Sequence, residues 1–115
     1  MAKYEKNFEG DFSEFLSWLQ NDITNGSISV SYEDGSNITM SDVRIAVRVF
    51  ERYSMTGANR VSLNITLVGV GNKLFLTAIT SGGSQAIFFK MNTLGESSFL
   101  KICKDSVEKY LSQKI

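Results

Sequence analysis

Apolar residues recur along the chain with two periods, and these periods divide it into helices and strands. Residues 12–23 follow helical spacing, and the apolar stripe is made by Phe12, Phe15, Leu16, Leu19 and Ile23. Asp11 precedes this stripe as an N-cap with Glu14 three residues later, and Asn25-Gly26 supplies a left-handed C-terminal stop. A second helix near the C-terminus places Phe99, Ile102, Cys103, Val107 and Tyr110 on one side.

Strict alternation of apolar and polar residues predicts the strands. The short N-terminal segment 2–8 and the segment 27–33 are expected as strands, and Asp34-Gly35 begins a turn or loop that reaches Asp42. Residues 61–67, 73–80 and 86–89 are expected as three further strands, with Gly69–Asn72 as a turn. Val61, Leu63, Ile65 and Leu67 form the expected core face of the first of these strands.

The segment 43–53 fits two periods. Residues 43, 46, 47, 50 and 53 satisfy helical spacing, with Ser41 as a cap. However, Val43, Ile45, Val47 and Val49 are β-branched residues in strict alternation, which favours a strand. On a strand the arginines of this segment share the face opposite those residues. Glu51 lies near the strand end, where we expect a salt bridge or an exposed position.

Together these elements predict one α+β domain over residues 1–115. The expected order is β-α-β-β-β-β-β-α, with an antiparallel sheet of about five to six strands and a helix toward each end of the chain. The first fifteen residues carry six charged side chains and no apolar core of a signal peptide, and no apolar run suits a membrane span. With one cysteine as well, the expectation is a cytoplasmic protein without membrane contact.

Charge is distributed unevenly along a chain whose net charge is zero. Residues 1–42 carry two lysines against eight acids, whereas residues 43–95 carry six basic residues against Glu51 alone. We expect the acidic N-terminal elements to pack beside the basic strands, with a basic sheet face for an anionic ligand as the alternative. The chain has no excess of positive charge, which argues against a nucleic-acid partner.

The residue inventory argues against an enzyme. Histidine is absent, which removes Ser-His-Asp and Cys-His nucleophile arrangements and histidine metal sites. Cys103 falls on the inward side of the last helix, so an inert buried thiol is expected. No metal or cofactor is therefore expected.

The arginines and one glycine loop are the candidate binding groups. Arg44, Arg48 and Arg52 would line up on one strand face about 13 Å from end to end, beside the polar side chains of the neighbouring strand. The loop Ser81-Gly82-Gly83-Ser84 could present backbone N–H groups to an anion, although a hairpin turn is the simpler interpretation.

Two longer runs carry a family resemblance. Residues 49–63, VFERYSMTGANRVSL, and 78–86, AITSGGSQA, resemble a small uncharacterised family of Gram-positive bacterial proteins. The resemblance spans nearly the whole chain and implies a bacterial cytoplasmic protein, but no activity. The element order is also similar to that of helix-grip proteins, whose curved sheet wraps a C-terminal helix.

The leading hypothesis is therefore a non-enzymatic module that binds a small anionic or amphiphilic ligand at these arginines and this loop. The alternative is a homodimer or another protein-interaction module that uses sheet edges or the polar sheet face.

Overall fold

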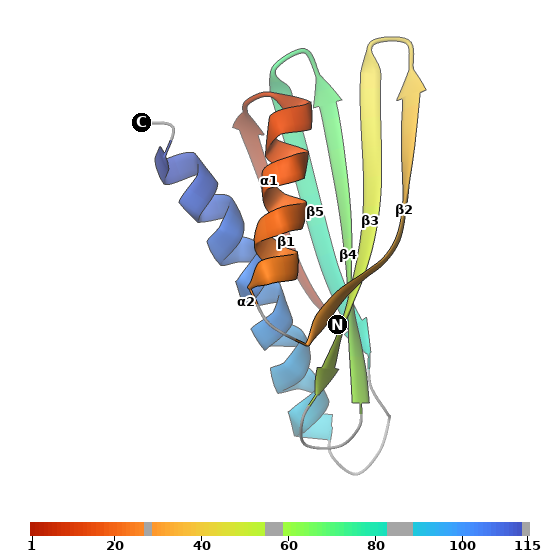
Figure 1. Cartoon of the computed structure of the whole chain (residues 1–115), viewed down its shortest axis with the longest axis vertical. Coiled ribbons are helices and arrows are strands. Elements are labelled where there is room, and N and C mark those ends of the chain that lie inside the picture. Colours follow the sequence, from red (N-terminus) through yellow and green to blue (C-terminus); the bar gives the residue numbers. More distant parts are fainter. Residues whose placement is uncertain (27–28, 55–58, 83–88, 114–115) are drawn as a thin grey trace.

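The computed structural model describes residues 1–26, 29–54, 59–82 and 89–113, and it shows one antiparallel sheet with two helices (Figure 1). The strands are β1 (Ala2–Glu9), β2 (Val30–Met40), β3 (Val43–Ser54), β4 (Asn59–Val70) and β5 (Lys73–Gly82). The helices are α1 (Phe12–Asn25) and α2 (Phe89–Gln113). The predicted α+β class is confirmed, and five strands lie in the described part of the chain. Residues 86–88 of the further predicted strand fall outside the described residues, and Phe89 begins α2.

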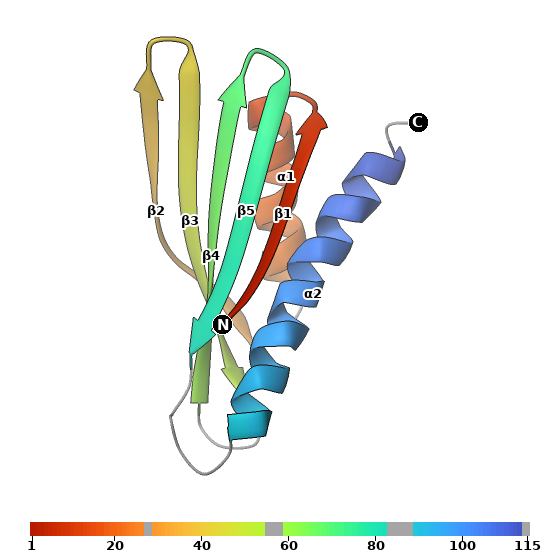
Figure 2. The ribbon, with the colours of Figure 1, turned by 180° about the vertical axis from the view of Figure 1, so that it is seen from behind.

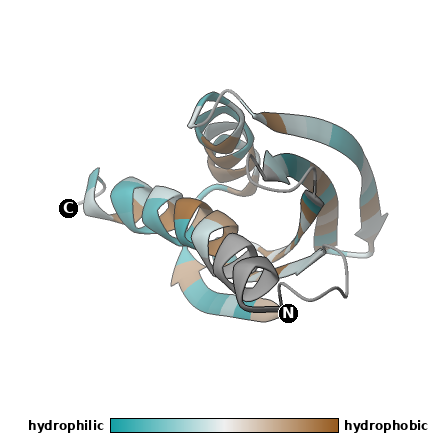
Figure 3. Ribbon diagram, turned by 90° about the horizontal axis from the view of Figure 1, so that it is seen from below, coloured by the Kyte–Doolittle hydropathy of each residue, from teal (hydrophilic) through white to brown (hydrophobic). Residues whose placement is uncertain are grey.

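The sheet order is β1-β5-β4-β3-β2, so β4 is the central strand and β1 and β2 are the edges. Both helices lie on the concave side of the curved sheet (Figure 3). The face on the other side carries no helix over strands β2 to β5 (Figure 2). The fold is thus two layers, with the core between the helices and the concave face.

The core confirms the predicted helical and strand stripes. Phe12, Phe15, Leu19 and Ile23 of α1 are buried, and Phe15 contacts the rings of Phe8 and Tyr110 edge-on. The predicted core face of β4 is buried throughout, as are four of the five predicted residues of the last helix; the fifth, Ile102, packs at the edge of the core. Trp18 covers the core at the helix interface, where its indole N–H donates to the Ser106 carbonyl oxygen at 3.2 Å.

The N-terminal end of α1 follows the prediction, and its C-terminal end does not. The Asp11 side chain accepts a hydrogen bond from the Glu14 backbone N–H at 2.8 Å, as an N-cap should. Gly26 has φ −76° and ψ −14°, so the helix ends in a right-handed conformation and the predicted left-handed stop is wrong. Instead the Gly26 N–H donates to the Ile23 carbonyl oxygen at 3.2 Å.

The predicted loop between Asp34 and Asp42 is also wrong, because β2 continues through it to Met40. The register of β2 against β3 shifts between Tyr32 and Asp34, which makes a β-bulge with Glu33 as the extra residue. Gly35 suits this bulge because a Cβ there would lie 2.6 Å from the Val47 carbonyl oxygen. The turn-forming residues therefore bend a strand, and Ser41, with φ 57°, makes the hairpin.

No helix among the described residues has the length and apolar character that a membrane crossing requires.

Candidate functional site

The segment 43–53 is a strand, and its arginines line one face as predicted, but the face is not the expected one. Arg48 pairs with Ile65 and Arg52 with Val61, both of which belong to the buried face of β4. The predicted neighbours of the arginines, Ser62, Asn64 and Thr66, lie on the other side of the sheet. The arginine row therefore borders the helix-covered core, and the prediction of a polar outer face around it is wrong.

Arg44 and Arg48 join β3 to α1. The Arg44 guanidinium lies 4.3 Å from the centre of the Phe12 ring and donates to the Ser13 hydroxyl oxygen at 3.1 Å. Arg48 donates to the Gln20 side-chain oxygen at 3.1 Å, and to the carbonyl oxygens of its neighbour Val47 and of Ser36 on β2. Both guanidinium groups thus hold neighbouring elements together.

Arg52 meets the other helix. Its guanidinium lies 5.2 Å from the centre of the Phe99 ring of α2. Partial burial lowers the pKa of Arg52 from its ordinary value, since burial disfavours a charged group. Together, the three arginines fasten the helices and β2 to β3, whereas Arg60 forms an exposed ion pair with Glu51 at 2.9 Å.

Replacing Arg48 with alanine is expected to lower the free energy of unfolding by about 1–2 kcal/mol, because three oxygen acceptors lose a charged donor. Arg60→Ala is the matched control, and it should lower the free energy of unfolding much less than Arg48→Ala because the Arg60 ion pair is exposed. Urea denaturation monitored by circular dichroism measures both. If the free energy of unfolding fell by the same small amount in both variants, Arg48 would not hold α1 and β2 to β3.

The predicted glycine loop is only partly described. Ser81 pairs with Ser62, and the hydroxyl groups of the two lie 3.0 Å apart on the side of the sheet away from the arginines. A Cβ at Gly82 would lie 2.6 Å from the Arg60 carbonyl oxygen, so the Gly82 backbone packs closely on β4. Gly83 and Ser84 lie outside the described residues. The described residues do not bring Ser81 together with the arginine row.

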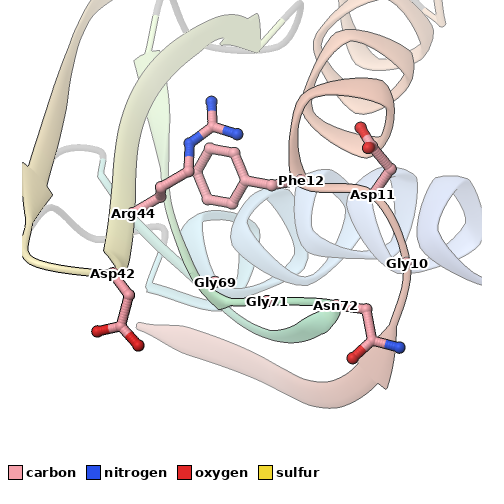
Figure 4. A pocket seen from close by; sticks show the side chains of 8 residues that line it. All are labelled: Gly10, Asp11, Phe12, Asp42, Arg44, Gly69, Gly71 and Asn72. Carbon is pink, nitrogen blue, oxygen red and sulfur yellow. The ribbon is translucent and has the colours of Figure 1, made fainter.

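A cavity of about 310 Å³ lies where the turns β1–α1, β2–β3 and β4–β5 meet (Figure 4). The Phe12 ring and the Arg44 side chain form one wall, and the Asp11 and Asp42 carboxylates lie on either side of them. Gly69 makes room for the ring, since a Cβ there would lie 2.7 Å from Phe12 Cδ2. A guanidinium and two carboxylates leave this cavity without a clear preference for an anion or a cation.

The described residues hold no group of three metal-ligating side chains. Cys103 is fully buried, and burial raises the pKa of its thiol to about 12. The predicted burial of Cys103 is confirmed, and its inertness stays a prediction that the raised pKa supports, because the reactive thiolate is disfavoured there.

The feature that the sequence reasoning missed is the uncovered side of the sheet, which we call the open face. It consists of the side chains of β2–β5 that point away from the helices. Its apolar members are Ile38, Met40, Val43, Ile45, Val47, Val49, Val68, Val70, Phe75 and Ile79. Several are strongly exposed, among them Met40 at 64% and Ile38 at 45%.

A signal for this face was present in the sequence. β3 carries the alternating Val43, Ile45, Val47 and Val49 on one side, and the buried Ala46 and Phe50 on the other. A strand that is apolar on both sides is typical of burial on both sides. The alternation of the β-branched residues, taken alone, indicates only one buried side.

Comparison with known proteins gives a family but no activity. No curated protein and no solved structure matches the chain. A model of a family of unknown function, DUF6054, matches residues 1–111. The chain therefore belongs to the DUF6054 family, in agreement with the predicted resemblance to an uncharacterised family.

Proposed function

We propose that this domain is a protein-interaction module that binds through its open face. The observation that carries the proposal is the chemistry of β3, whose outward side chains from Val43 to Val49 are all apolar although no helix covers them. An antiparallel sheet with one solvated face normally alternates apolar residues inward and polar residues outward. β3 departs from that pattern on the side where a partner could bind.

The apolar side chains of the open face are contiguous. Ile38, Ile45, Val68 and Phe75 are register partners across four neighbouring strands, so they form an unbroken apolar row. A second row beside it contains Met40, Val43 and Val70. Scattered surface apolar residues are ordinary, but a contiguous patch marks an interaction surface.

Binding of a small anionic ligand at the arginine row has less support. Arg44 and Arg48 donate to protein oxygens, and Arg44 and Arg52 also lie over aromatic rings. A ligand there would have to compete with contacts that hold the helices. The absence of histidine leaves a non-enzymatic role as the prediction.

Thiol labelling in the cells that make the protein tests whether the open face is covered. Ile38→Cys and Thr39→Cys form a matched pair, since the two positions are adjacent and exposed on β2 but point to opposite sides of the sheet. Cys103 should give little background because its thiol is buried and burial raises its pKa. A maleimide should label Ile38→Cys at least about tenfold more slowly than Thr39→Cys, because the partner excludes the reagent.

Equal labelling rates at the two positions, in intact cells and in the native fold, would contradict the proposal. Urea-unfolded samples of both variants are the control for intrinsic thiol reactivity, and they should label equally.

A further inference from the structure

We infer that the surface that covers the open face is the open face of a second copy of this chain. The two sheets would pack face to face about a two-fold axis that runs parallel to the strands, between β3 and β4. This inference rests on the proposed function, and it adds the partner and the geometry.

The register of the sheet suits this axis. Each row of side chains across β2, β3, β4 and β5 would face the same row of the second copy in reverse order. Ile38 would then lie opposite the partner subunit's Phe75, and Ile45 opposite the partner subunit's Val68. The next row places Val43 opposite the partner subunit's Val70. Sheets of a sandwich pack with strands within about 30° of each other, which keeps these rows in contact.

Polar rows meet polar rows under the same operation. Thr66 and Thr77 are register partners, and their row includes Ser36 and Val47. A two-fold axis across the strands, through the row that runs from Ile38 to Phe75, would instead bring the row of Met40, Val43 and Val70 against this row. The axis parallel to the strands is therefore the arrangement that places all of these rows against rows of the same composition.

The charges at the margins of the open face are complementary under this axis. The β2 side has the carboxylates of Asp34 and, at the β2–β3 turn, Asp42, whereas the β5 side has the ammonium group of Lys73. The two-fold axis brings each acidic margin to the lysine margin of the other copy. The charged side chains of β1 on this face, Lys3, Glu5 and Glu9, lie on the outermost strand, beyond the directly opposed strands.

Lys73 and Asp42 are the charged pair whose replacement tests the inferred dimer most clearly. Both side chains are exposed, and within the described part of the chain neither side chain forms a hydrogen bond or an ion pair. Their replacement therefore removes no contact that the monomer needs. In the inferred dimer Lys73 lies beside the partner subunit's Asp42, and the symmetry repeats the pair.

The open face is also large enough. Four strands about 4.8 Å apart and about eight residues long, at about 3.4 Å per residue, give a projected area of about 500 Å² per copy. Side-chain relief makes the accessible area larger than this projected value, and a specific interface of standard size buries about 800 Å² of accessible surface per partner.

Mixing two charge-reversal variants tests the partner and the geometry together. In a Lys73→Glu homodimer both pairs become repulsive, and the same holds for an Asp42→Lys homodimer. A mixed dimer of the two variants keeps one native Lys73–Asp42 pair and makes the other pair attractive again with its two charges exchanged. We expect each variant alone to raise the dimer Kd about tenfold and the equimolar mixture to regain wild-type affinity, measured by sedimentation velocity at low salt.

Each outcome separates the inference from the proposed function. A purified wild-type chain that stays monomeric at several hundred micromolar, while Ile38→Cys is protected in cells, overturns the second copy and retains the interaction module. A wild-type dimer that the mixture does not restore overturns the parallel two-fold geometry. Restored association in the mixture, with unchanged circular dichroism of both variants, supports the inference in full.

Discussion

Phe15→Ala is expected to lower the free energy of unfolding by about 3–5 kcal/mol, the range for removing a fully buried aromatic ring. Phe15 has no exposed surface, and its ring lies 4.7 Å from Phe8 on β1 and 5.0 Å from Tyr110 on α2, centre to centre. The ring therefore joins α1 to the sheet and to the second helix. A domain of this size is stable by only about 5–15 kcal/mol, so the variant should be close to unfolding.

Urea denaturation measures this loss, and Ile79→Ala is its control. Ile79 is on the open face and 38% exposed, so its truncation should cost less than about 1 kcal/mol in the monomer. Both values should be taken at low protein concentration, where dissociation does not contribute. A Phe15→Ala loss as small as that of Ile79→Ala would mean that α1 is not packed as the structure shows.

The core of the fold could be predicted because its signals are local. The stripe from Phe12 to Ile23 has helical spacing and an Asp11 cap, and both appear in α1. The alternation from Val61 to Leu67 assigns the buried face of β4 without knowledge of any partner strand. Each of these patterns has one apolar side, so the choice of the buried side was unambiguous.

The face of β3 could not be chosen from its own sequence. Val43, Ile45, Val47 and Val49 look like a core face, and the opposite side carries arginines. The structure buries Ala46 and Phe50 between those arginines, because the long guanidinium side chains reach past the core to the helices. Which side of β3 is buried therefore depends on the position of the helices and on the register with β4, and both are long-range features.

The candidate site was missed for the same reason. If the β-branched side of β3 were the core face, as its alternation suggests, no apolar surface would remain to be explained. The bulge of β2 was not predicted for a similar reason: Asp34-Gly35 is a turn signal, but here it accommodates an extra residue in a strand. In both cases, pairing across the sheet overrode a local signal.

Ile38→Lys is expected to raise the Kd for self-association at least about a hundredfold, which corresponds to about 2.7 kcal/mol. In the inferred dimer the new ammonium would face the partner subunit's Phe75, and the symmetry places a second one at the equivalent position. An unpaired charge loses hydration there without gaining a partner. The monomer should be unaffected, because Ile38 is 45% exposed and a lysine on an edge strand is well tolerated.

Thr39→Lys is the matched control for this prediction. It adds the same charge one residue further along β2, on the side away from the open face. Its Kd should therefore stay within about threefold of the wild-type value. A comparable loss in both variants would point to edge pairing of β2 or to a general effect of charge.

Sedimentation velocity of the wild-type chain from low to several hundred micromolar concentration, beside these two variants, tests the central claim most directly. The expected result is a wild-type and a Thr39→Lys species that reach twice the 12.8 kDa chain mass, and an Ile38→Lys species that stays at the chain mass. A wild-type chain that remains at 12.8 kDa throughout, or an Ile38→Lys chain that dimerises as the wild type does, would contradict self-association through the open face.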